Sequence, residues 1–197
     1  SGDFAAKYRT DDEEYRKLTQ STFIELWNRG LVYEATRPNN YCPECGTTIA
    51  DAEVQYEELA TRLVYVKFRV KETAEPLVIA TTRPELICAC QLVIVNPSDE
   101  RYITIRGKHA TLPIYERDVE IKPHPSARPE FGTGAVMVCS YGDYADVLLF
   151  RELGLPETIA TGQDGKLTQV AGPYQGLTVA EARVRIVQDL ESKELLI

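Results

Sequence analysis

Residues 62–70 read Arg-Leu-Val-Tyr-Val-Lys-Phe-Arg-Val, and from this stretch onward the apolar residues recur with a period of two. Leu63, Tyr65 and Phe68 open the pattern, which is typical of β-strands. Further strand candidates follow at residues 77–82, 91–95, 102–105, 111–115, 118–121 and 134–139. Prolines separate these short segments, and this arrangement favours a closed or strongly bent antiparallel sheet.

A helical pattern precedes the strands, over residues 11–29. Its apolar residues fall at three- and four-residue spacings, as one buried helical stripe requires. Thr10 and Glu13 form a T-x-x-E capping box at its start, and Gly30 is the expected stop. The stripe consists of Tyr15, Leu18, Thr22, Phe23, Leu26 and Trp27.

Two further helices are predicted after the strands. Residues 144–153 form a short one, which Gly154 ends. The second begins at the capping box of Thr178 and Glu181, and its apolar stripe runs through Val184, Val187 and Leu190. Between the two helices, residues 162–165 read as a hairpin-like turn.

Composition restricts the class of protein. The chain has 197 residues, of which 44% are hydrophobic and 26% charged, with a formal charge of −8, as expected for a globular domain. No stretch approaches the roughly 20 apolar residues of a membrane-spanning helix, and the amino terminus has no secretory pattern. Residues 1–60 hold 6 basic and 12 acidic residues, against 16 and 18 in residues 61–197. Neither part has the basic excess that would bind a nucleic acid through phosphate contacts alone.

The five cysteines form an odd set without a signal peptide, so we expect reduced thiols in a cytoplasmic protein. Cys42 and Cys45 form a C-x-x-C turn followed by Gly46, which can place two thiolates on one zinc ion, although structural zinc needs four ligands. The pair is therefore either two free thiols or half of a zinc site completed outside this chain, and a redox pair is a minor third option. Cys88 and Cys90 are spaced C-x-C in a strand-like run, which points them to one face of a sheet.

Polar groups gather at the end of the buried strand at residues 77–80. Thr81, Thr82 and Arg83 offer hydroxyls and a guanidinium to an ester, a ribose or an adenine edge, and Pro84 ends the strand. Without further context, an ordinary strand end with a solvated arginine explains the same residues.

A second group of candidates follows the glycine loop at residues 132–134. That loop precedes a strand, so neither the dinucleotide fingerprint nor the P-loop fits. After the strand, Asp143 and Asp146 lie three residues apart at a helix start, hence on one side of its first turn. They are either a helix cap and a dipole partner, or carboxylates that bind an ammonium group and accept a hydroxyl or orient water.

Seven short stretches occur in a fixed order: Tyr15-Arg16 and residues 22–26, 30–33, 41–45, 50–54, 81–85 and 132–136. In this combination they resemble the connective-peptide-1 insertion of class I aminoacyl-tRNA synthetases, the group of the valyl, isoleucyl and leucyl enzymes. Residues 137–143 with Asp146 look most like the valyl enzymes of archaeal type. The resemblance implies an α+β editing domain, a closed antiparallel β-barrel core with peripheral helices. Residues 1–60 would form an N-terminal helix and CxxC knuckle connector, and residues 61–197 the editing barrel.

The resemblance also implies roles for individual residues. Asp143 matches a family aspartate that holds the α-ammonium group of the substrate, and Asp146 matches one associated with the threonine hydroxyl. Thr81, Thr82 and Arg83 match the residues that line the pocket around the amino acid and the terminal adenosine. The family's ATP-binding signatures are absent from this sequence, so we expect no amino-acid activation by this chain.

Three positions depart from the bacterial valyl pattern. Leu86, Met137 and Cys139 stand where a threonine, a lysine and a threonine are usual. Met137 and Cys139 are kept as substrate-binding candidates, but hydroxyl recognition must use fewer or different partners than in the bacterial enzymes.

The resemblance therefore implies an aminoacyl-tRNA deacylase domain that removes threonine from mischarged valine tRNA, with Asp143 and Asp146 as the expected catalytic residues. The valyl enzymes are the standard example of this need: their hydrophobic synthetic pocket rejects the threonine isostere by only about 10², so a second, hydrolytic site must remove the error. An isoleucyl editing domain that clears valine and a non-catalytic zinc-knuckle module are the alternatives. The expected partners are the 3′ end of aminoacylated tRNA and the remainder of the parent synthetase, without a membrane. Editing should need no cofactor, and Cys42 and Cys45 would hold zinc only in the longer parent.

Overall fold

The computed structural model describes residues 7–35, 37–58 and 60–197. The chain divides into two compact units, the first ending at Arg37 and the second spanning Pro38–Ile197. The CxxC turn is thus grouped with the second unit, whereas the boundary expected from the sequence lay near residue 60. Within the described ranges, no helix combines the length and the apolar character that crossing a bilayer requires.

In the described part of the first unit there is one helix, α1 (Glu13–Asn28). The capping box expected at Thr10 and Glu13 is wrong, because Asp12 is the N-cap and accepts a hydrogen bond from the Tyr15 backbone N–H at 2.7 Å. The predicted end is confirmed: Gly30 has φ +69° and its N–H donates to the Trp27 carbonyl.

The predicted stripe of α1 is not buried within its own unit. Phe23 is 53% and Trp27 51% exposed, and α1 has no buried residue among those described. Among the described residues of its unit, no other helix or strand is present to cover the apolar face of α1, so a regular apolar period predicted the helix but not its burial.

The second unit begins with a small hairpin, β1 (Tyr41–Cys42) and β2 (Thr47–Thr48), followed by the 3₁₀ turn η1 (Asp51–Glu53). The barrel strands then follow in chain order. They are β3 (Val64–Val70), β4 (Pro76–Thr81), β5 (Cys90–Val95), β6 (His109–Thr111), β7 (Asp118–Pro123) and β8 (Ala135–Cys139).

The six strands form one sheet in the order β4-β3-β6-β7-β5-β8, and β8 lies beside β4, which nearly closes the sheet into a barrel. The expectation of a purely antiparallel barrel is wrong, because β5 pairs with β7 in parallel. The chain between them, residues 96–117, is a crossover rather than a hairpin, and parallel neighbours require such a connection.

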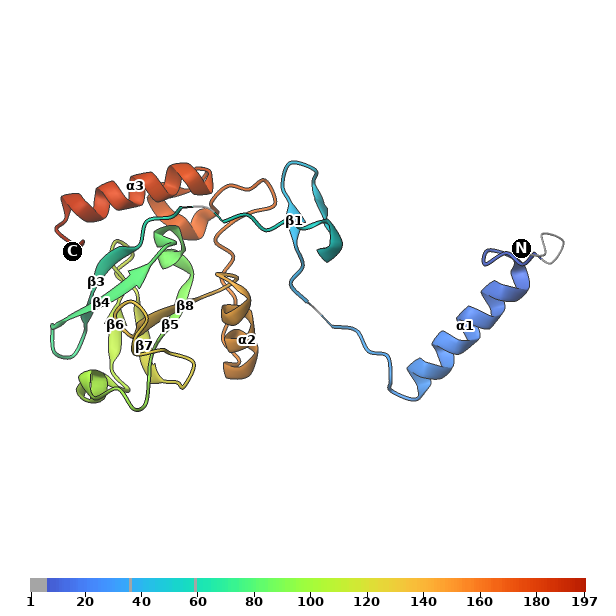
Figure 1. Cartoon of the computed structure of the whole chain (residues 1–197), viewed down its shortest axis with the longest axis horizontal. Helices are drawn as coiled ribbons and strands as arrows, with labels where there is room; N and C mark the ends of the chain where they lie inside the picture. The colour runs from blue at the N-terminus through green and yellow to red at the C-terminus, as the bar shows by residue number, and fades with distance from the viewer. Residues whose placement is uncertain (1–6, 36, 59) are drawn as a thin grey trace. The chain divides into compact units, whose positions relative to one another are not determined.

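Helices pack around the barrel (Figure 1). α2 (Tyr144–Leu153) has the predicted bounds, and α3 (Val179–Ser192) has the predicted capping box of Thr178 and Glu181. The buried face of α3 differs from the expected one: Ala182, Ile186 and Leu190 are buried, at steps of four. The remaining elements are the 3₁₀ segments η2 (Pro84–Ala89), η3 (Glu100–Ile105) and η4 (Gln169–Tyr174).

Two strand predictions fail. Residues 102–105 lie in η3, which starts where the Asp99 carboxylate accepts a hydrogen bond from the Arg101 N–H at 3.1 Å. Local capping therefore prevails over the β-branched residues of this segment. Only His109–Thr111 of the region around residues 111–115 forms a strand, and Cys88 lies in η2 rather than in a strand with Cys90.

The core fills the barrel and extends beneath α2. In β3 the buried residues are Val64, Val66, Phe68 and Val70, on one face of the strand, while Tyr65 points to solvent. β5 is buried on both faces, with Val93 and Val95 in the barrel and Leu92 and Ile94 under α2.

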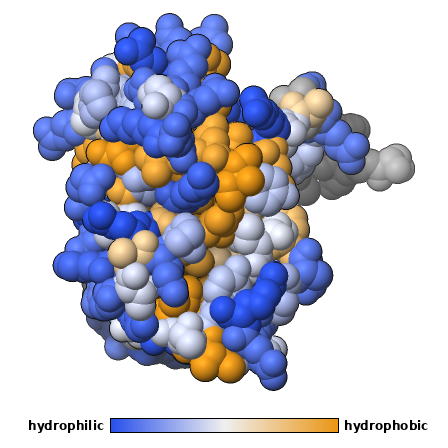
Figure 2. Space-filling view, turned by 90° about the vertical axis from the view of Figure 1, so that its left-hand side faces the viewer, coloured by the Kyte–Doolittle hydropathy of each residue, from blue (hydrophilic) through white to orange (hydrophobic). Residues whose placement is uncertain are grey.

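Some apolar surface remains exposed on the second unit, including Ile103, Val184 and Ile197. Figure 2 shows that apolar residues also gather in one area of the face it presents, bordered by polar residues. Contiguous apolar areas are a common feature of surfaces that contact partners.

Candidate functional site

Three segments that are distant in the sequence meet around one cavity of about 340 Å³. The carboxyl end of β4 supplies Thr81, Thr82 and Arg83, and β8 supplies Met137 and Cys139. The first turn of α2 and its N-cap supply Asp146 and Asp143. The structure thus brings all seven of the predicted catalytic and substrate-binding residues together.

Other residues of this cavity were not singled out from the sequence as site residues. They are Leu63, Ala80, Leu86, Phe131, Val136 and Gly142. The glycine loop was noticed as a motif, and its position explains why glycine is needed: a Cβ on Gly132, where φ is +58°, would lie 2.7 Å from the Ala80 Cβ. The loop therefore packs directly against β4, and this packing places the exposed side chain of Phe131 at the cavity.

The polar strand end is ordered by its own hydrogen bonds. Thr81 is buried, and its hydroxyl oxygen accepts a bond from the Arg83 backbone N–H at 3.0 Å, which fixes the turn after β4. The Arg83 side chain donates from Nε to Glu85 Oε1 at 3.1 Å and from Nη1 to the Gly142 carbonyl oxygen. Arg83 therefore joins the strand end to the turn before α2.

The two aspartates have different surroundings. Asp143 is exposed and caps α2, because its Oδ1 accepts a hydrogen bond from the Asp146 N–H at 2.8 Å. A carboxylate has further lone pairs, so this cap does not prevent a second partner. Asp146 is half-buried, and its Oδ2 lies so close to Gly142 that a Cβ there would be only 2.0 Å away.

Burial and the neighbouring Asp143 carboxylate raise the pKa of Asp146 to about 7. The backbone N–H groups of Cys139 and Asp143 and the Arg83 charge act in the opposite direction. A carboxyl group with a pKa near neutrality can exchange a proton with a reacting water, which an ordinary aspartate does poorly.

The β8 wall of the cavity offers little polar chemistry. Met137 and Cys139 are both buried. Contact with the Cys90 thiol and burial raise the pKa of Cys139 well above its ordinary value, so this thiol stays protonated. Cys139 therefore lines the cavity as a small apolar group and is not an activated nucleophile.

The CxxC turn lies outside this cavity. The Cys45 backbone N–H donates to Cys42 Sγ at 3.3 Å, and the Gly46 N–H donates to the Cys42 carbonyl at 2.9 Å. Hydrogen bonds from Cys45 lower the pKa of Cys42, and the Cys42 thiol raises that of Cys45. Among the residues that the structure describes, no cluster of three His, Cys, Asp or Glu side chains could hold a metal ion.

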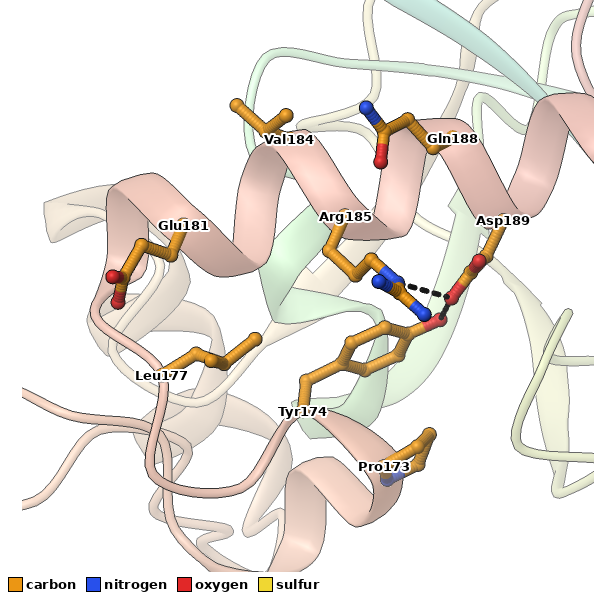
Figure 3. Close-up of a pocket in the computed structure, with 8 residues that line it drawn as sticks. All are labelled: Pro173, Tyr174, Leu177, Glu181, Val184, Arg185, Gln188 and Asp189. Carbon is orange, nitrogen blue, oxygen red and sulfur yellow. Dashed lines mark hydrogen bonds and ion pairs between the residues drawn. The ribbon is translucent and has the colours of Figure 1, made fainter.

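A wider cavity of about 630 Å³ lies between α3 and η4, as Figure 3 shows. Three of its polar side chains contact one another: the Tyr174 hydroxyl donates to Asp189 Oδ2 at 2.8 Å, and Arg185 Nε lies 3.7 Å from the same oxygen. It contains none of the predicted site residues, so the smaller cavity is the stronger candidate.

Comparison with known proteins places this geometry in a family context. Residues 1–178 match the family model described as tRNA synthetases class I (I, L, M and V). The valine--tRNA ligase of Nanoarchaeum equitans is 51% identical over 191 residues, covering 97% of this chain and 25% of the relative. That of Aeropyrum pernix is 48% identical, covering 95% and 23%. The chain thus spans about a quarter of the length of these relatives.

A solved structure shares the fold. The crystal structure of the ternary complex of Agrobacterium radiobacter K84 agnB2 LeuRS, tRNA and LeuAMS matches with a TM-score of 0.55 at 17% sequence identity. The match covers 94% of this chain and 32% of that one.

The environment of Asp146 predicts a pH-dependent stability. Because the pKa of Asp146 is raised from 3.8 to about 7, the folded state keeps a proton on this group at pH values where the unfolded state has lost it. The contribution of Asp146 to the free energy of unfolding is therefore fully present below about pH 4 and is lost as the pH rises to about 7. We expect Asp146→Asn to be more stable than the parent chain at pH 8, by about 1–3 kcal/mol after allowance for partial exposure, and equal to it near pH 4. Urea unfolding between pH 4 and pH 8 measures this.

Asp143→Asn provides the second arm, because it keeps the cap but removes the repelling charge. Without the Asp143 charge the pKa of Asp146 should fall. The decrease in the free energy of unfolding with rising pH should therefore level off at a lower pH in Asp143→Asn than in the parent chain. Parallel curves for Asp146→Asn and the parent chain across the whole range would contradict the raised pKa of Asp146.

The CxxC turn predicts weak metal binding by this chain. Two thiolates leave half of a tetrahedral zinc site without protein ligands. After incubation with zinc and dialysis against a chelator, elemental analysis should find far less than one zinc ion per chain. Stoichiometric zinc in the monomer, lost on the change Cys45→Ser, would overturn this expectation.

Proposed function

Because the chain belongs to the class I tRNA synthetases (I, L, M and V), we propose that it is their hydrolytic editing domain and removes threonine mischarged on valine tRNA. The observation that carries the proposal is the convergence of Thr81, Thr82, Arg83, Asp143 and Asp146 on one cavity. The valine--tRNA ligase relatives favour threonine as the rejected residue over the isoleucyl alternative.

The proposed reaction needs a placed water more than a strong nucleophile, because an aminoacyl ester is already activated. The water oxygen bonds to the ester carbonyl carbon and gives up a proton. The bond from that carbon to the ribose oxygen then breaks, and the ribose oxygen takes up a proton. Asp146, with its pKa of about 7, can accept the first proton and return it to the leaving oxygen.

Different side chains of the cavity bind different parts of the substrate. The exposed Asp143 carboxylate faces solvent at the α2 start, where it can hold the α-ammonium group of the amino acid. Asp146, with Thr81 and Thr82, places the threonine hydroxyl and the water. Arg83 lies at the adenosine side of the substrate or fixes the local loop geometry, and its bonds to Glu85 and Gly142 support the second role.

The partners follow from the same proposal. The 3′ end of an aminoacylated tRNA enters the cavity, and the remainder of the parent synthetase covers the exposed apolar face of α1, including Phe23 and Trp27. The editing reaction itself uses no metal. Zinc at Cys42 and Cys45 would need further ligands from outside this chain, since among the described residues no third His, Cys, Asp or Glu side chain joins these two thiols in a cluster.

The first prediction from this function concerns substrate choice. The 197-residue chain should deacylate threonine-charged valine tRNA faster than the valine-charged form, because valine leaves a buried acceptor unpaired. Release of labelled amino acid measures both rates. Hydrolysis no faster than in buffer would contradict the editing function, and a preference for valine-charged isoleucine tRNA would support the isoleucyl alternative.

Asp146→Ala should lower the rate with threonine-charged tRNA and narrow the advantage of threonine over valine. Asp146 is the carboxylate of the cavity that is not assigned to the ammonium group and so can accept the threonine hydroxyl, and the apolar Met137 and Cys139 offer no substitute. If both substrates slow by the same factor, Asp146 places water only, and the hydroxyl must be recognised by Thr81, Thr82 or the backbone.

Asp143→Asn tests the ammonium site, since asparagine keeps the helix cap and loses the charge. Because Asp143 is exposed, its pair with the substrate stays partly solvated, and we expect kcat/KM to fall about 10- to 100-fold. The matched control is Asp164→Asn, an exposed turn aspartate outside the cavity. Equal activity of the two variants would leave Asp143 with the role of a cap.

A further inference from the structure

Glu85 is a carboxylate that the proposed reaction does not use, and its side chain is 0% exposed. It lies in η2, two residues after Arg83. Burial opposes its ionisation, but hydrogen bonds from Arg183, its own backbone N–H and Arg83 outweigh this effect, and the pKa of Glu85 is below its ordinary value. Glu85 is therefore a buried negative charge compensated by two arginines.

The two arginines come from different parts of the chain. Arg183, on α3, binds Glu85 through two bonds, from Nε to Oε2 at 3.1 Å and from Nη2 to Oε1 at 2.8 Å. Arg83 shares Oε1 through its Nε at 3.1 Å. A two-point bond of this kind fixes the carboxylate in orientation as well as position, so Oε1 presents a defined acceptor to Arg83.

Arg83 connects Glu85 to the turn before α2, which contains Gly142. Arg83 Nη1 donates to the Gly142 carbonyl oxygen, and Gly142 lies directly against Asp146 Oδ2, where a Cβ would be only 2.0 Å away. Release of Arg83 from Glu85 would free the guanidinium, remove an anchor of the Gly142 turn and let the Asp146 carboxylate move.

We propose that Glu85 and Arg183 are positioning residues for the candidate editing site, holding Arg83 against the Gly142 turn and thereby fixing the Asp146 carboxylate. This inference rests on the proposed function for its kinetic consequence, but its geometric consequence is independent of activity. Through this chain of contacts α3, which contributes no residue to the cavity, would still control the geometry of the cavity.

The matched pair Arg183→Met and Arg185→Met tests the inference. Both arginines are on α3, with side chains 40% and 65% exposed, but Arg185 pairs with Asp189 at the surface. We expect Arg183→Met to lower kcat for threonine-charged tRNA about 10- to 100-fold, the cost of a small misplacement of reacting groups, with little change in KM. Arg185→Met should stay within about twofold of the parent chain.

A second readout separates positioning from loss of stability. Groups that face Asp146 are Asp143 on its own turn, Cys139 on β8 and Arg83 after β4. The backbone N–H groups of Cys139 and Asp143 favour the charged form of Asp146, and so does the side-chain charge of Arg83. In Arg183→Met, Glu85 loses its fixed orientation and Arg83, its remaining partner, should follow it away from the Gly142 turn. The titration of Asp146, followed by carbon-13 NMR of labelled aspartates and assigned with Asp146→Asn, should then shift to higher pH. Arg185→Met should leave it unchanged.

Each outcome bears on the proposal. If the parent chain deacylates and both methionine variants match it in kcat and Asp146 titration, the positioning role is wrong. If the parent chain does not deacylate, the proposed function fails, and the titration alone decides the positioning role. If Arg183→Met does not fold, Arg183→Lys keeps a charge near Glu85 but loses the two-point bond. An unshifted Asp146 titration in this variant would overturn the proposal.

Discussion

β8 hydrogen-bonds to β5 on one side and packs beside β4 on the other, and the candidate site depends on this placement. The carboxyl end of β4 and the segment that leaves β8 thereby meet at one edge of a nearly closed barrel. Residues around 81 and around 143 are brought together only because the sheet curves far enough for its first and last strands to meet. A flat sheet of the same strand order would leave them at opposite edges.

The cavity at this edge combines one charged side with one inert side. Asp143 and Asp146 stand at the start of α2, while Met137 and Cys139 present apolar surface from β8. This contrast suits hydrolysis of an activated ester, because the apolar wall raises the pKa of a nearby carboxyl group without supplying a competing nucleophile. The buried ion pair of Glu85 and Arg183 then connects α3 to the same edge through Arg83.

Much of this architecture could be predicted from the sequence where local signals and tertiary structure agree. The bounds of α2 and the capping box at Thr178 followed from caps and apolar periods, and the family motifs indicated the residues that now line one cavity. The parallel pairing of β5 and β7 could not be predicted, because a crossover and a long loop look alike in sequence. The strand expected at residues 102–105 failed because the cap at Asp99 decides that segment.

The residues that line the candidate site could be predicted from the sequence, but the hydrogen bonds and ion pairs among them and their neighbours could not. Glu85 belongs to the quoted motif, yet nothing in the sequence indicates that its partner lies 98 residues later, at Arg183. Likewise, the apolar period of α1 predicted a buried face, whereas a helix alone in its unit leaves that face exposed. Long-range contacts between charged groups have no local pattern, and only the folded barrel identifies them.

The cavity between β4, β8 and α2 is the proposed binding site for the aminoacylated end of a tRNA. The most direct test is an NMR titration of the chain with a non-hydrolysable analogue, adenosine carrying threonine through a 3′-amide. We predict saturable shifts at the backbone amides of Thr82, Gly142 and Asp146, lost in Asp143→Asn, with none at Gln188 in the cavity between α3 and η4. Shifts confined to the cavity between α3 and η4, or no shifts at millimolar analogue, would contradict this binding site.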